Sequence, residues 1–108
     1  HGVVIEHPPL ERWTTYCHMH AVSVEPGQAV SRGEPIGQVG RSGSTSDVPH
    51  VHLELCTFPC ASHADGDFFG TEDPLSIADG CYEADRVYPS DRLVVTFPVA
   101  CLYWVRWR

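Results

Sequence analysis

The chain has 108 residues, a length that suits one small domain with a modest hydrophobic core. Its seven basic residues stand against fourteen Asp and Glu, which gives a formal net charge of −7. This balance argues against nucleic acid and against anionic membrane surfaces as partners. The sequence contains no signal peptide and no apolar run of transmembrane length, so we expect no membrane insertion.

The first half of the sequence alternates short β-prone segments with turns. Residues 3–7 and 13–18 are rich in β-favouring side chains, and the intervening Pro8 and Pro9 predict that they form a hairpin. Further short apolar segments at 22–24, 30 and 36–40 are separated by Gly and Pro, which supply turn conformations. No convincing amphipathic helix is visible. The predicted fold class is all-β, with a small antiparallel β-sheet and a loop-rich, Cys-containing C-terminal extension.

The composition changes after the first half of the chain. A loop rich in Asp, Gly, Ala and Ser follows residue 57, and residues 93–105 are apolar and β-prone. Such a segment needs a partner strand, either in the same sheet or in another domain. We therefore expect a core domain over residues 1–78 and, over residues 79–108, a C-terminal β extension or the start of a further domain. Because the sequence opens at His1 and enters an apolar run at once, we also expect it to be a processed or excised segment.

Five cysteines in a chain of this length favour an oxidising compartment. Cys17 is expected to be a buried thiol on the strand face opposite to that of its neighbours. Two disulfides among the other four have three possible pairings, and the sequence does not choose between them. Cys56 and Cys60 could instead bind a structural zinc, although no second closely spaced pair accompanies them. The four are Cys56, Cys60, Cys81 and Cys101.

The pair His50 and His52 carries the strongest chemical signal. Side chains two residues apart in a strand leave the same face, so the two imidazoles are expected to lie side by side. Histidine is the commonest metal ligand at neutral pH, and a catalytic zinc needs three protein ligands with a further position open for water. The pair therefore indicates part of a metal site or of a proton-transfer site.

The order of the motifs resembles the core of the LytM/lysostaphin-type zinc metalloendopeptidases, which cut peptide cross-bridges or stems in bacterial cell walls. The matching segments are GVVIEH at 2–7, YCHM at 16–19, VEPGQAV at 24–30, GEPIGQVG at 33–40 and PHVHLE at 49–54. The ordered series is specific where any one motif is weak. The resemblance covers residues 2–55. It implies a β domain of the lysostaphin-like type, also called the duplicated hybrid motif.

The resemblance implies a role for each of three histidines. His52 matches the family's zinc ligand in its His-x-His motif, while His18 and His50 match two catalytic histidines that do not bind the metal. In the family, the Zn²⁺ polarises the scissile carbonyl and lowers the pKa of its bound water, and the paired imidazoles assist proton transfer and stabilise the oxyanion. Tyr16 and His18 are expected to share one strand face.

The family's other two zinc ligands come from a His-x-x-x-Asp motif that lies before the strand at 3–7, and this sequence opens after that position. His63 and Asp67 have the same spacing but follow the His-x-His motif. They are candidate additional ligands of a permuted metal site. The plainer interpretation is that they belong to a solvated loop whose Asp and Gly residues make turns.

The resemblance implies a zinc-dependent peptidoglycan hydrolase in the periplasm, at the cell surface or outside the cell, with a peptidoglycan peptide as substrate. The alternative is a degenerate, non-catalytic module that binds cell-wall peptide or regulates another hydrolase. A third possibility is a secreted, disulfide-stapled β domain without a site. Neither the oligomeric state nor the peptide bond that is cut follows from the sequence.

Overall fold

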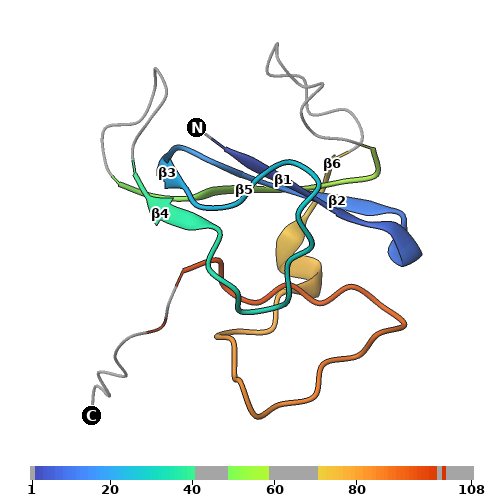
Figure 1. The fold of residues 1–108 in the computed structure, drawn as a ribbon. Helices are drawn as coiled ribbons and strands as arrows, with labels where there is room; N and C mark the ends of the chain where they lie inside the picture. Colours follow the sequence, from blue (N-terminus) through green and yellow to red (C-terminus); the bar gives the residue numbers. More distant parts are fainter. Residues whose placement is uncertain (1, 41–48, 59–70, 100, 102–108) are drawn as a thin grey trace.

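Two antiparallel sheets organise the protein, and the computed structural model describes residues 2–40, 49–58, 71–99 and 101. The larger sheet has the order β1 (Val3–His7), β2 (Arg12–Cys17), β5 (His52–Cys56) and β6 (Thr71–Glu72) (Figure 1). The smaller one pairs β3 (Met19–Val22) with β4 (Gly37–Val39). All paired strands run antiparallel, which confirms the predicted all-β class.

The predicted hairpin at the start of the chain is present. β1 pairs with β2 from Val3 opposite Tyr16 to His7 opposite Arg12. A short 3-10 turn, η1 (Pro8–Leu10), connects them, because Pro8 and Pro9 have no N–H with which to continue the ladder. The second strand ends at Cys17, one residue earlier than expected.

The strand register separates the larger sheet into two faces. On one face lie Thr14 and Leu55, which are directly paired and almost fully buried. On the other lie Cys17 and its partner His52, with Glu54 two residues further along β5. We call this second face the histidine face, because it carries the candidate site.

The smaller sheet depends on a close backbone approach at Gly37. A Cβ at this position would lie 2.2 Å from the carbonyl oxygen of Ala21 and 2.3 Å from the terminal methyl of Met19. Only glycine allows this contact, since the carbonyl oxygen of Ala21 is a backbone atom that cannot turn aside. Met19 is in turn 4% exposed and belongs to the small hydrophobic core.

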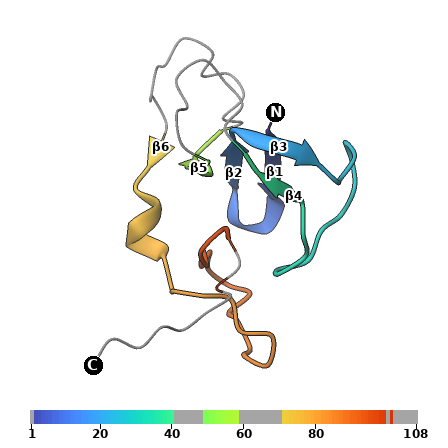
Figure 2. The same ribbon diagram turned by 90° about the vertical axis from the view of Figure 1, so that its left-hand side faces the viewer.

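The C-terminal segment completes that core. It begins with η3 (Pro74–Ile77), whose first turn is capped by the Asp73 carboxylate accepting from the Leu75 N–H at 2.9 Å. Residue 95 then makes a parallel bridge with residue 78, and Val94 and Val95 are both buried. In two perpendicular views the segment lies below the larger sheet, beside the loop that joins β3 to β4 (Figures 1 and 2).

Arg32 joins that loop to the C-terminal segment. Its guanidinium donates to the carbonyl oxygen of Val94 at 2.9 Å and lies over the ring of Tyr88, 4.4 Å from the ring centroid. Tyr82 stacks on Tyr88 with a centroid separation of 6.0 Å and fills the space beside Gly33. The described part of the expected 93–105 strand pairs with the segment after η3, through the bridge between residues 78 and 95 and a hydrogen bond from the Phe97 N–H to the Gly80 carbonyl at 2.8 Å. Among the described residues it does not join the larger sheet.

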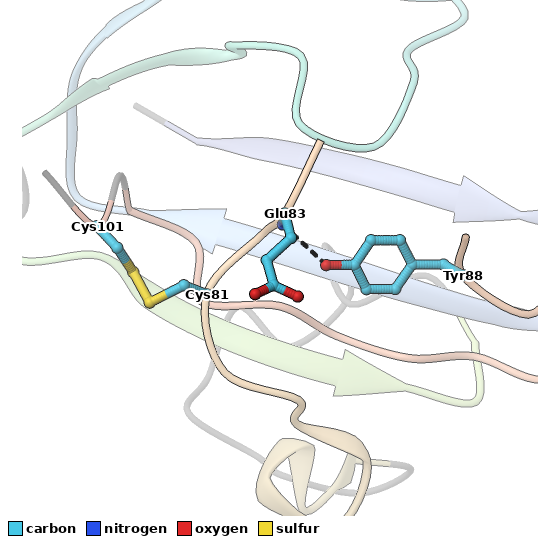
Figure 3. Close-up of a disulfide and its surroundings, with 4 residues drawn as sticks. All are labelled: Cys81, Glu83, Tyr88 and Cys101. Atoms are coloured by element: carbon cyan, nitrogen blue, oxygen red, sulfur yellow. Dashed lines mark hydrogen bonds between the residues drawn. A yellow bond between two sulfur atoms is a disulfide. The ribbon is translucent and has the colours of Figure 1, made fainter. Parts of the chain in front are cut away.

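A disulfide secures the same segment. Cys81 is bonded to Cys101, and nearby the Glu83 N–H donates to the Tyr88 hydroxyl at 2.9 Å (Figure 3). Cys56 is also disulfide-bonded, which leaves it no thiolate for the structural zinc considered above. Cys60 lies outside the described residues. Cys17 is a free thiol.

Candidate active site

Three imidazoles from two separate parts of the chain meet on the histidine face. The ring centroid of His18 lies 5.0 Å from that of His50 and 5.8 Å from that of His52. The His18 and His52 rings meet edge to face, with an interplanar angle of 84°. The structure thus brings together the three histidines that the sequence singled out, although they are up to 34 residues apart in the chain (52 − 18).

His18 reaches this cluster through a backbone reversal. It has a φ of 63°, the left-handed region, and stands between the end of β2 and the start of β3. A left-handed residue breaks the alternation of a strand, so His18 does not share a face with Tyr16 as expected. Tyr16 pairs with Leu53 on the opposite face instead. His18 thus reaches His50 and His52 through a left-handed turn and not through strand alternation.

His50 is held by Gly40 rather than by the strand that bears His52. Its backbone N–H donates to the Gly40 carbonyl at 2.9 Å, and β5 begins only at His52. Gly40 is buried, and a Cβ there would lie 2.3 Å from the backbone nitrogen of His20. Gly40 is therefore the point where the smaller sheet, which follows His18, touches the segment that carries His50.

His52 has a carboxylate partner on its own strand. Its Nε2 lies 3.1 Å from Oε1 of Glu54, and both side chains leave the histidine face because they are two residues apart. The Glu54 side chain is 17% exposed, against 43% for His52. Sequence reasoning did not assign Glu54 a role, although its spacing of two from His52 was a signal that could have found it.

Cys17 differs from its prediction as a buried thiol. It is half-buried, and its register places it directly opposite His52, so it borders the site. Burial, and then the nearby Glu54 carboxylate, raise the pKa of the thiol. Cys17 is consequently a neutral thiol at pH 7 and not an activated nucleophile.

The other two described histidines lie apart from the cluster. His7 pairs with Arg12 on the opposite face of the larger sheet, and its Nε2 lies 3.0 Å from the Thr14 hydroxyl. Burial, with a smaller contribution from the Arg32 cation, lowers the pKa of His7. His20 is exposed on β3.

The described residues supply only part of a metal site. His52 offers an imidazole nitrogen, but among residues 2–40, 49–58, 71–99 and 101 no group of three His, Cys, Asp or Glu side chains could hold a metal ion. His63 and Asp67, the additional candidates, lie outside these ranges. The described residues therefore do not by themselves fit a catalytic metal, whose protein ligands number three.

Comparison with known proteins identifies the class to which this β domain and its histidine cluster belong. The sequence model of peptidase family M23 matches residues 1–63. The chain belongs to this family, as a LytM-type domain. Members of the family are in general metallopeptidases.

One curated relative carries the name of a specific activity. The chain is 43% identical over 53 residues to the peptidoglycan DD-endopeptidase ShyA of Vibrio cholerae serotype O1. The aligned part is 49% of this chain and 12% of that protein, so the chain spans about an eighth of its relative. No solved structure is significantly similar to the chain. In the described part of the chain, no helix has the length and apolar character needed to cross a membrane.

Proposed function

We propose that this protein is a zinc-dependent endopeptidase that hydrolyses peptide bonds in peptidoglycan outside the cytoplasm. The observation that carries the proposal is the convergence of His18, His50 and His52 on one sheet face, with ring centroids 5.0 and 5.8 Å from that of His18. Membership of a peptidase family and the name of the similar Vibrio protein support the reaction and the substrate.

In this proposal the three histidines divide the work. His18 and His50 lie close enough to act on the same substrate group, one accepting a proton as water attacks and the other stabilising the oxyanion or protonating the leaving amine. His52 is the metal donor. A bound metal would supply Lewis acidity and a more acidic water, and its further ligands would have to come from outside the described residues.

Hydrolysis and metal content should be measured together. Purified chain is mixed with Zn²⁺ and a cross-linked peptidoglycan peptide, and products are followed by mass spectrometry. His18→Ala and His50→Ala are expected to lower turnover roughly 10²- to 10⁴-fold while retaining zinc, because they remove proton transfer. His52→Ala is expected to lose zinc. His20→Ala is the matched control, since this exposed histidine lies outside the cluster.

The second candidate is a non-catalytic LytM-type module that binds cell-wall peptide or regulates another hydrolase. It is favoured by one observation, namely that the described residues hold no three-ligand group. Zinc stoichiometry separates the two candidates. If the chain binds about one zinc, and both His52→Ala and His63→Ala lose it, the site is completed by the second half of the chain. If the chain binds no zinc and hydrolyses nothing but still binds the peptide, the result supports the non-catalytic module.

A further inference from the structure

We propose that Glu54 is a positioning residue for His52, whose carboxylate holds the imidazole as the Nε2–H tautomer in one ring orientation and leaves Nδ1 as the nitrogen with a free lone pair. This inference rests on the proposed function for its consequence in catalysis. Its structural part concerns the chain alone.

The contact itself determines which atom donates. The Glu54 Oε1 lies 3.1 Å from His52 Nε2, a distance that suits a hydrogen bond. An ionised carboxylate only accepts, so the proton of the bond must be on Nε2. In a neutral imidazole only one nitrogen carries a proton, and Nδ1 is then the acceptor. A hydrogen bond made by one ring nitrogen thus sets the chemistry of the other.

The surroundings of Glu54 explain why the bond persists. The side chain is 17% exposed, and a carboxylate withdrawn from water needs a donor. The arginine ion pairs of the described residues engage other carboxylates: Arg12 pairs with Glu72, and Arg86 pairs with Asp79. His52 is therefore the donor that the described structure gives to Glu54.

The cluster explains why the ring orientation matters. The His52 ring stands at 84° to that of His18, with the centroids 5.8 Å apart. A rotation of the ring by half a turn about its bond to Cβ would exchange the positions of carbon and nitrogen atoms relative to His18. Because the carboxylate binds Nε2 only in one orientation, Glu54 selects the ring orientation and leaves Nδ1 with the free lone pair. Carboxylates that orient ligating histidines act in this way at metal sites.

The test separates the structural claim from the catalytic one. Histidine side-chain ¹⁵N–¹H NMR is recorded on the metal-free chain and on Glu54→Leu, which removes the acceptor, and Glu54→Gln, which keeps an acceptor oxygen without the charge. Glu6→Leu is the matched control, since Glu6 is an exposed glutamate on the same face, paired with Trp13.

The expected result is an Nε2–H signal of His52 that is protected from exchange with water in the wild type, in Glu54→Gln and in Glu6→Leu, and that disappears in Glu54→Leu. A protected signal that survives in Glu54→Leu, or a wild type with its proton on Nδ1, overturns the proposal.

Turnover of the cross-linked peptide provides the second readout. Glu54→Leu should lower kcat/KM roughly 10- to 100-fold, the usual effect of removing such a partner, and Glu54→Gln should restore most of it. Unchanged kcat/KM in Glu54→Leu, in an active wild type, overturns the catalytic part. A wild type without any hydrolysis rejects the proposed function, while the NMR comparison still decides whether Glu54 holds His52.

Discussion

The close backbone contact at Gly40 predicts that an added side chain there destabilises the fold and disturbs the histidine cluster. In Gly40→Ala the new Cβ would lie 2.3 Å from the His20 nitrogen and 2.7 Å from its Cα, distances that no relaxed structure permits. The neighbour is backbone, so β3 must move away by about 1 Å. Overpacking of this kind costs about 3 kcal/mol, which corresponds to a fall in Tm of roughly 10–20 °C for a domain of this size. The displacement also separates the segment that follows His18 from the one that carries His50.

Thermal unfolding followed by circular dichroism gives the stability, and the amide resonance of His50 reports its bond to the Gly40 carbonyl. Gly27→Ala is the matched control: Gly27 has a φ of +84°, but a Cβ added there would meet no atom within 4 Å, so only backbone strain of about 1 kcal/mol is expected. The reasoning is refuted if Gly40→Ala unfolds within 2 or so degrees of the wild type, roughly the effect of 0.5 kcal/mol, and leaves the His50 amide unmoved.

Three further predictions concern the C-terminal disulfide and the surroundings of His7. Replacing Cys81 and Cys101 by Ser should cost about 3 kcal/mol, as expected for opening a loop with a sequence separation of 20, and equal urea midpoints with and without the disulfide would contradict this. Because the pKa of folded His7 is depressed below its usual 6.5, its contribution to stability is complete above pH 6.5 and is lost as the pH falls below that value. Urea midpoints at about pH 7.5 and about pH 5.5 should therefore differ less in His7→Gln than in the wild type, whereas the exposed control His20→Gln should retain the full difference. Arg32→Met should raise the pKa of His7, measured by NMR titration, because the Arg32 cation disfavours the charged imidazole; an unchanged His7 titration would contradict this electrostatic influence.

Local signals in the sequence determined the N-terminal hairpin and the residues of the candidate site. Pro8 and Pro9 set the end of β1 and the turn to β2, because proline removes the donors that a ladder needs. The spacing of His50 and His52 predicted that their imidazoles lie near one another, and both rings approach that of His18. The order of the motifs indicated the family to which the chain belongs. The division at residue 78 and the catalytic roles of the histidines stay predictions.

Tertiary structure decided how the site is assembled. His18 joins His50 and His52 because a left-handed backbone turn carries its ring to the histidine face, and a period-two pattern holds no information about such a turn. The pairing of Cys81 with Cys101 likewise required the fold, since cysteine spacing allows several pairings of similar loop entropy. The sequence by itself determined which side chains are available for chemistry. Their relative positions were determined by contacts between distant segments, because such contacts depend on packing that no local pattern encodes.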